Sequence, residues 1–304
     1  MSVQRFAVSP SGLAVAGAVG MATMGVMARY SGVDAAVITF YRLGLGALFV
    51  ALLLALLPGA HWRRPHVLTL VSGALLAGFI VFYVRAMDHT TMANAVLTVY
   101  LAPPLAALAG HFIWHERLGR WQAACIGAAL LGFATMMEFR VKLSAADLQG
   151  LGFAGLALLC YAAFMLLNRH NPDRIPPLQA VFWQLLVGAL VMLWVAGPTA
   201  LAVPVEALPW MLATGLLPGF LALTCTVLAM QRLPTAQFGT LAYSEPVAVI
   251  LFGWLLFAEI LSPLQVTGCL LIIAAGIVQA RVSAASTPVE PLLADTEAGK
   301  NFAQ

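Results

Sequence analysis

Ten stretches of about 20 mostly apolar residues follow one another along this chain, and each is long enough to cross a lipid bilayer as a helix. The stretches are residues 11–30, 35–57, 66–87, 90–114, 119–138, 147–168, 177–197, 207–230, 234–258 and 263–281. Only 9% of the residues are charged and the mean hydropathy is +0.94, whereas an ordinary soluble domain carries about 25% charged residues. The sequence therefore predicts an all-α integral membrane protein that is surrounded by the lipid bilayer.

The basic residues near the helix ends predict the orientation of the helices, because Lys and Arg accumulate on the cytoplasmic side of a membrane. With the N-terminus inside, ten basic residues lie on the inner side, namely Arg5, Arg63, Arg64, Arg117, Arg120, Arg169, Arg174, Arg232, Arg281 and Lys300. Four lie on the outer side, namely Arg29, Arg85, Arg140 and Lys142. We therefore expect both termini in the cytoplasm. Residues 282–304, rich in Ser, Thr, Pro, Glu and Asp, are expected to form a disordered cytoplasmic tail.

One segment occurs twice, 143 positions apart and without a gap, each time with a proline in the middle of the expected helix. The first copy holds Tyr100, Pro103, Gly110, Glu116 and Leu118, and the second holds Tyr243, Pro246, Gly253, Glu259 and Leu261. Weaker matches join 40–43 to 182–185 and 75–79 to 216–220, with a register drift that insertions or deletions in loops would allow. A proline is tolerated in the middle of a membrane helix because neighbouring helices satisfy the freed carbonyl.

The two copies predict two halves of opposite orientation, because five helices per half is an odd number. The first half is expected over residues 1–143 and the second over 144–281. Inverted repeats are typical of transporters whose binding site lies at the midplane between the halves.

On these repeated residues, the chain resembles the drug/metabolite transporter superfamily, in its ten-helix branch with two EamA-type repeats. The resemblance covers about residues 1–281. It implies a secondary transporter of the bacterial inner (plasma) membrane, with the third, fourth, eighth and ninth helices around a central cavity. Members of the superfamily export amino acids, aromatic ones among them, and other metabolites. Export of amino acids, aromatic ones included, is the first expectation, with the aromatic amino-acid exporters as the branch considered, and multidrug or other-metabolite export is the alternative.

Two charged residues lie deep within the expected spans, where a charge is costly and is by default functional or paired. Arg42 lies in the second span and could contact a substrate carboxylate, or form a structural ion pair with Asp34 or Glu138. Glu245 lies in the ninth span, directly before Pro246. It could carry a proton or hold a substrate ammonium, or it could stay neutral and bond to the backbone that the proline frees.

Polar and aromatic residues complete the expected binding site. Gln237, Thr240 and Ser244 share one face of the ninth helix. The counterpart of Gln237 in the first copy is Asn94, and the two amides could hold both ends of a zwitterion. Five amphipathic rings could line the cavity or belong to the interfacial aromatic belts, namely Tyr83, Tyr100, Tyr161, Trp183 and Tyr243.

The prolines of the two broken helices are the expected hinges. Pro103 is followed by Pro104 in the first copy, whereas Pro246 stands alone in the second, so the first break should be sharper. Glu116 and Glu259 are expected at the membrane interface, where each could satisfy amides of the next helix.

No motif in the sequence indicates catalysis, a metal or a cofactor. The four cysteines stand singly inside apolar runs, without C-x-x-C spacing. His111 and His115 precede Glu116, but Gly119 stands where an H-E-x-x-H motif needs its second histidine. The G-x-G-x-x-G run at 150–155 opens an expected membrane helix and follows no strand. We therefore expect no catalytic residue, metal ligand, cofactor or nucleic-acid partner. An intramembrane enzyme and a channel are minor alternatives, and the sequence is compatible with a monomer.

Overall fold

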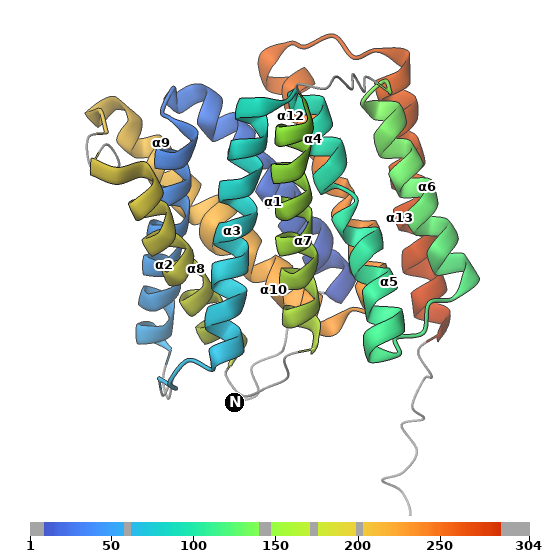
Figure 1. Cartoon of the computed structure of the whole chain (residues 1–304), viewed down its shortest axis with the longest axis horizontal. Helices are drawn as coiled ribbons and strands as arrows, with labels where there is room; N and C mark the ends of the chain where they lie inside the picture. Colours follow the sequence, from blue (N-terminus) through green and yellow to red (C-terminus); the bar gives the residue numbers. More distant parts are fainter. Residues whose placement is uncertain (1–8, 58–61, 140–146, 171–175, 199–202, 287–304) are drawn as a thin grey trace, which may run out of the picture.

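The computed structural model describes residues 9–57, 62–139, 147–170, 176–198 and 203–286, and the secondary structure within these ranges is helical (Figure 1). The first half holds α1 (Pro10–Ser31), α2 (Ala35–Leu56), α3 (Val67–His89), α4 (Met92–Val99), α5 (Ala102–Trp114) and α6 (Arg120–Met136). The second half holds α7 (Leu148–His170), α8 (Pro177–Ala196), η3 (Val205–Ala207), α9 (Leu208–Thr214), η4 (Gly215–Ala222), α10 (Leu223–Arg232), α11 (Thr235–Ala242), α12 (Ser244–Phe257) and α13 (Pro263–Ser286). The elements η3 and η4 are a 3₁₀-helix and a π-helix.

These elements confirm the predicted all-α membrane fold. The fourth predicted span is divided into α4 and α5, the ninth into α11 and α12, and the eighth runs from η3 to α10. Within the described residues, nine stretches are long and apolar enough to cross a membrane, judged by length and composition alone. The remaining predicted span corresponds to α6, which has 17 residues and is shorter than the others.

Local sequence explains where several helices begin and end. Ser9 accepts a hydrogen bond from the N–H of Gly12 at the start of α1, and Asp34 accepts one from Ala36 at the start of α2. Gly32 ends α1 in the left-handed conformation, with φ of 62°, which a residue without Cβ adopts at little cost. The connection from α1 to α2 therefore takes only three residues.

The last helix is longer than the sequence analysis predicted. The predicted span ended at 281, but α13 continues through Ser286, because residues 282–286 contain neither Gly nor Pro to stop it. The rest of the predicted tail lies outside the described residues. Five of the basic residues used to predict the orientation also lie outside them, namely Arg5, Arg140, Lys142, Arg174 and Lys300.

Equivalent helices of the two halves pack in equivalent ways. The helix α1 packs on the α9–η4–α10 stretch, as its counterpart α7 packs on α3. The pairs α2 with α8 and α6 with α13 each join a helix to its own counterpart. The first described helix begins, and the last one ends, at the lower end of the bundle in Figure 1. We call this end the near side and the opposite end the far side.

The π-helix η4 brings the second half unusually close to α2. Pro218 lies inside η4 and cannot donate a hydrogen bond to the preceding turn. The next residue, Gly219, lies against the carbonyl oxygen of Arg42, so that an added Cβ would collide with it. A Cβ on Gly46 would lie 3.0 Å from the carbonyl carbon of Gly219. This close approach fixes the backbone of α2 at Arg42.

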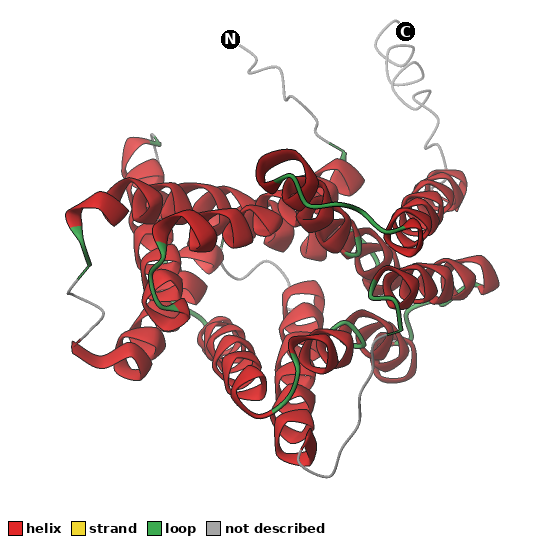
Figure 2. Ribbon diagram, turned by 90° about the horizontal axis from the view of Figure 1, so that it is seen from above, coloured by secondary structure: helices red, strands yellow, loops and turns green. Residues whose placement is uncertain are grey.

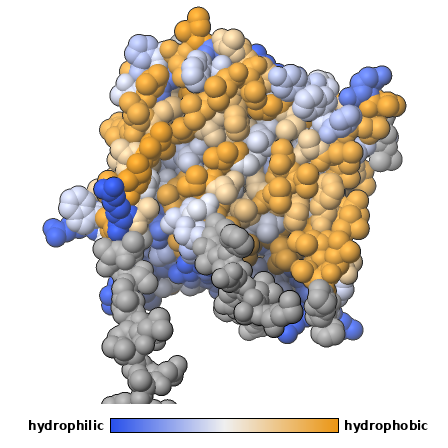
Figure 3. Space-filling model, turned by 180° about the vertical axis from the view of Figure 1, so that it is seen from behind, coloured by the Kyte–Doolittle hydropathy of each residue, from blue (hydrophilic) through white to orange (hydrophobic). Residues whose placement is uncertain are grey.

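The outer surface is suited to lipid. Large apolar side chains such as Leu56, Trp194 and Ile260 are 81%, 85% and 96% exposed. Hydrophobic residues cover most of the face shown in Figure 3, and hydrophilic ones gather toward its edges. The view along the helices in Figure 2 shows the described chain as a set of helices joined by short loops. The structure is that of a multi-pass membrane protein.

Candidate functional site

Four of the candidate residues come together around a fifth, Glu245, which lies in the first turn of α12. Glu245 interacts electrostatically with Arg42 of α2 and with three tyrosines, namely Tyr83 of α3, Tyr100 at the end of α4 and Tyr161 of α7. The side chains of all five are half-buried. We call this group the central polar cluster. It joins elements of both halves, as expected for a site at the midplane of an inverted repeat.

Within this cluster, Arg42 has capacity for a further partner. One terminal nitrogen of its guanidinium lies 3.6 Å from the sulfur of Met21, and its Nε has no hydrogen-bond partner among the described residues. The two structural partners considered from the sequence have other roles. Asp34 caps α2, and Glu138 accepts a hydrogen bond of 2.5 Å from the hydroxyl of Ser262. A buried donor without a partner is costly, so this guanidinium is suited to binding an anionic group.

The tyrosines of the cluster are held by aromatic neighbours. Tyr161 stacks on Phe79 with ring centroids 4.9 Å apart, and Tyr83 stacks on the same phenylalanine at 6.1 Å. Tyr100 stacks on Phe133 of α6 at 4.3 Å. These contacts give the cluster rigid aromatic walls with polar tips.

The two breaks in the helices meet directly. The hydroxyl of Tyr243, at the second break, donates a hydrogen bond of 2.6 Å to the carbonyl oxygen of Tyr100, at the first. Tyr243 is completely buried beside Phe133, so in this conformation it connects the breaks and does not face open space. The sequence analysis considered Tyr243 as a cavity-lining ring or a member of an aromatic belt, and no sequence signal predicts this hydrogen bond.

The expected hinge prolines lie in the first turns of the second half-helices, where a missing N–H has no consequence. Pro103 and Pro104 open α5, and Pro246 opens α12. Two residues separate α4 from α5, whereas Tyr243 alone separates α11 from α12. The pair Pro103 and Pro104 thus follows the longer of the two breaks, the one between α4 and α5.

The two predicted amides lie at opposite ends of the bundle. Asn94, near the far-side end of α4, donates a hydrogen bond of 3.0 Å to the hydroxyl of Thr90, which in turn donates to Asp147. Gln237, near the near-side end of α11, donates one of 3.1 Å to Ser11. The inverted repeat places equal sequence positions at opposite membrane faces. The expectation that both amides hold one zwitterion therefore does not fit this conformation.

The other predicted polar residues are used locally. Thr240 donates a hydrogen bond of 3.0 Å to the carbonyl oxygen of Ala236 in α11, and Ser244 donates one of 2.6 Å across the break to the carbonyl oxygen of Leu241. Trp183 is half-buried, and its indole N–H has no hydrogen-bond partner among the described residues.

A second buried polar group was missed by sequence reasoning. Gln184 of α8 donates hydrogen bonds to Asn168 of α7 at 2.9 Å and to Ser72 of α3 at 3.1 Å, and Asn168 donates to Ser72 at 3.0 Å. All three side chains are at most 4% exposed. The repeat contained one signal that could have identified Gln184 as a candidate: the match of 40–43 to 182–185 makes it the counterpart of Arg42. This group holds three helices together.

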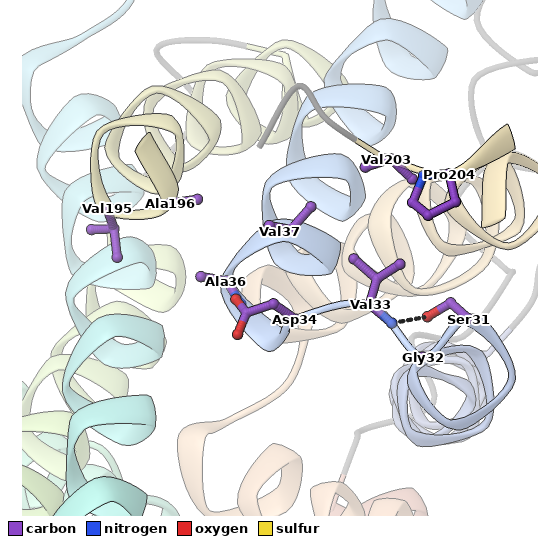
Figure 4. A pocket seen from close by; sticks show the side chains of 10 residues that line it. All are labelled: Ser31, Gly32, Val33, Asp34, Ala36, Val37, Val195, Ala196, Val203 and Pro204. Atoms are coloured by element: carbon purple, nitrogen blue, oxygen red, sulfur yellow. Dashed lines mark hydrogen bonds between the residues drawn. The ribbon is translucent and has the colours of Figure 1, made fainter. Parts of the chain in front are cut away.

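A surface pocket of about 570 Å³ opens at the far side, between the α1–α2 connection and the end of α8 (Figure 4). Its lining includes Asp34, Val37, Val195 and Pro204 and none of the predicted site residues. Within the described part of the chain, no three His, Cys, Asp or Glu side chains gather as metal ligands would.

Comparisons with known proteins agree with this architecture. The chain is 32% identical over 235 residues to an uncharacterized transporter of Pseudomonas aeruginosa, covering 73% of this chain and 76% of the relative. It is 24% identical to the threonine/homoserine exporter RhtA of Escherichia coli, over 78% of this chain and 79% of the relative. A crystal structure that is 20% identical superposes with a TM-score of 0.78, over 90% of this chain and 98% of the other, which shows the fold alone.

The family comparison covers nearly the whole of the ten-helix body. The model of the EamA-like transporter family matches twice, at residues 10–137 and 148–279, once in each half of the helix set. The match, the paired packing of equivalent helices and the polar cluster between the halves lead to one conclusion: the chain belongs to the EamA-like transporter family, and it is a transporter and not an enzyme.

Proposed function

We propose that the chain is a secondary transporter that exports amino acids, aromatic ones included, across a bacterial inner membrane by alternating access. The observation that carries the proposal is the presence of Arg42 and Glu245, of opposite charge, in one half-buried cluster between the two halves. A zwitterion needs one group of each sign at close range. The printed name of one relative, a threonine/homoserine exporter, belongs to the same chemical class of substrate.

In this proposal the guanidinium of Arg42 holds the substrate carboxylate and the carboxylate of Glu245 holds its ammonium group. The rings of Tyr83, Tyr100 and Tyr161 accommodate the side chain, because an aromatic face accepts both apolar groups and cations. The breaks at Pro103, Pro104 and Pro246 are the hinges about which the half-helices move, and repeats 1–143 and 144–281 are the moving halves. The near side is the cytoplasmic side, in agreement with the predicted orientation.

A flux assay in liposomes tests the proposal. Purified full-length protein is expected to exchange labelled threonine and phenylalanine, and unlabelled neutral amino acids should compete. The matching amines, which lack the carboxylate, should compete far less. Arg42→Gln is expected to abolish this preference for amino acid over amine, whereas Arg120→Gln, an exposed cation outside the cluster, should retain it. Equal competition by amino acid and amine in the unmodified protein would refute the role of Arg42.

A multidrug or other-metabolite exporter is the second candidate. It is favoured by the three tyrosines around one carboxylate, an arrangement that also suits a lipophilic aromatic cation. Flux of a cationic dye without flux of any amino acid would replace the first proposal by this one.

A further inference from the structure

The two carboxylates that end the repeated segment occupy nearly identical surroundings at opposite sides of the membrane. Glu116 follows His115, and Glu259 follows Ala258, each in the left-handed conformation with φ of 54° and 52°. The N–H of Glu116 donates to the carbonyl oxygen of Gly110 at 3.1 Å, and that of Glu259 to the equivalent Gly253 at 3.2 Å. Each carboxylate is thus fixed at the end of its half-helix, Glu116 on the near side and Glu259 on the far side.

Each carboxylate also pairs with an arginine from the equivalent helix of the other half. Arg169 at the end of α7 donates to Glu116 at 2.9 Å, and Arg29 at the end of α1 donates to Glu259 at 2.5 Å. The residues that follow the two arginines contact equivalent rings: His170 stacks on Trp114 with ring centroids 4.6 Å apart, and Tyr30 lies tilted against Phe257 at 5.3 Å. We call these groups the near-side latch (Trp114, Glu116, Arg169, His170) and the far-side latch (Arg29, Tyr30, Phe257, Glu259).

The two latches differ in the additional helices that their charged side chains contact. The second oxygen of Glu116 accepts a hydrogen bond of 3.0 Å from the backbone N–H of Thr235, the first residue of α11. Arg169 donates another, also of 3.0 Å, to the carbonyl oxygen of Gln231 in α10. The start of α11 has no side-chain cap of its own, so Glu116 supplies one. The near-side latch therefore ties α5 and α7 to α10 and α11.

The far-side latch makes no equivalent connection among the described residues. The counterparts of Thr235 and Gln231 are Met92, at the start of α4, and Asp88, near the end of α3. Met92 is 66% exposed, whereas Thr235 is 2% exposed. The charged side chains of the far-side pair are each more than half exposed, against 14% and 28% for Glu116 and Arg169. The ion pair of the far-side latch thus joins α1 to α12, and Tyr30 of this latch also stacks on Trp210 of α9 with ring centroids 4.9 Å apart.

Helix packing shows the same asymmetry between the two sides. On the near side, α11 packs against α5, α6 and α7, and α10 packs against α7 and α8. On the far side, the half-helices α4 and α12 are the counterparts of α11 and α5, and they do not pack against each other to the extent that α11 and α5 do. The near side is closed in this conformation, and the far side does not have the corresponding closure.

We propose that Glu116 and Glu259 are alternating positioning residues of the transport cycle, each of which closes one side by capping the half-helix of the other repeat. In the conformation described, Glu116 caps α11 and holds the near side shut. In the opposite conformation Glu259 caps α4 at Met92, Arg29 moves to the end of α3 near Asp88, and Glu116 releases α11. This inference rests on the family assignment and is independent of the substrate proposed above.

Accessibility of two matched cysteines tests the latches in the full chain. In a variant without native cysteines, Ala236→Cys of α11 reports on the near side and its repeat counterpart Ala93→Cys of α4 on the far side. Ala236 is 4% exposed and packs against α5 and α6, whereas Ala93 is half-buried. A membrane-impermeant maleimide is applied from each side of sealed vesicles, and each latch variant is compared with its own cysteine background.

The two latches predict opposite results. Glu116→Gln should accelerate labelling at position 236 about tenfold or more and slow it at position 93, because hydrogen bonds to a charged group are lost from one conformation only. Arg169→Gln should have the same effect, without adding to that of Glu116→Gln. Glu259→Gln should leave the labelling rate at position 236 unchanged or lower it, and the cysteine at position 93 should remain accessible to the maleimide. The exposed Glu206→Gln is the control and should change neither rate.

Two results would overturn the proposal. One is labelling of position 236 in Glu116→Gln at the background rate. The other is a change in the same direction for Glu116→Gln and Glu259→Gln, which would indicate general loosening of the fold. Size-exclusion profiles and thermal unfolding of each variant separate misfolding from a shift between conformations. A failed amino-acid flux assay leaves these labelling results unaffected, so the two proposals fail independently.

Discussion

The contact between Gly239 of α11 and Pro103 of α5 leads to the sharpest quantitative prediction. The Cβ that Gly239→Ala adds would lie 2.9 Å from the Cβ of Pro103, whereas carbon atoms in contact lie about 3.5–4.0 Å apart. The two half-helices would have to separate by roughly 0.6–1 Å. Overpacking of this kind costs about 1–3 kcal/mol.

This free-energy cost applies to one conformation only, because α11 and α5 pack together where the near side is closed. A difference of about 1–3 kcal/mol shifts an equilibrium by roughly 5- to 150-fold. We therefore expect Gly239→Ala to raise the labelling rate of a cysteine at position 236 within this range. The other repeat has Val96 at the equivalent position, so Gly239→Val should have the larger effect of the two.

The matched control is Gly127→Ala in α6, since an added Cβ there meets nothing within 4 Å. It should label and unfold as the unmodified protein does. If Gly239→Ala folds normally and labels at the same rate as Gly127→Ala, the contact with Pro103 is not part of the near-side closure and the reasoning is refuted.

Three further predictions concern the charged and polar groups. If Glu245 carries protons, Glu245→Gln should abolish any dependence of flux on a pH gradient, and an unchanged dependence would exclude that role. Burial opposes ionisation of Glu116, but its hydrogen bonds to Arg169 and Thr235 prevail and hold its pKa below the ordinary 4.5. Because maleimide reacts with the thiolate, the labelling rate at position 236 is divided at each pH by the rate of the same cysteine in Glu116→Gln. With Arg169 and His170 facing Glu116, this ratio should be constant between about pH 6 and 8 and rise only as the pH falls below the pKa of Glu116; a rise near neutrality would contradict it. Asn168→Leu should remove one hydrogen-bond partner each from buried Ser72 and Gln184, cost about 2–3 kcal/mol and lower the unfolding temperature by about 5 °C, as measured by intrinsic fluorescence; an unchanged temperature would refute the stabilising role.

The helices were readily predicted because a bilayer imposes their length and leaves the backbone no alternative. The breaks at Tyr100 and Tyr243 were predicted for a similar reason, since a proline ends the preceding turn in any environment. The longer α13 was missed because composition near a helix end does not say where the helix stops.

The site was predicted in part. A single charged residue in an apolar span can be recognised in the sequence as a candidate functional residue. Arg42 and Glu245 are two such residues, and they interact electrostatically in the structure. Glu116 was expected to satisfy the amides of the next helix, but it caps α11, which lies far along the chain. Which side is closed could not be predicted, because both copies carry the same Glu and the sequence does not show which of the two caps a half-helix of the other repeat.

The π-helix η4 has a consequence for how the two copies diverged after duplication. Eleven positions separate Leu75 from Ala86 in the first copy, and thirteen separate their counterparts Leu216 and Ala229. The two additional residues do not lie in a loop, because Leu216 to Ala229 is continuously helical. A π-helix takes more residues per turn than an α-helix, so η4 absorbs the insertion and α10 recovers the register of its counterpart. The wider turns lie against the backbone of Arg42, so this difference between the copies alters the helix that packs on α2 and not a connecting loop.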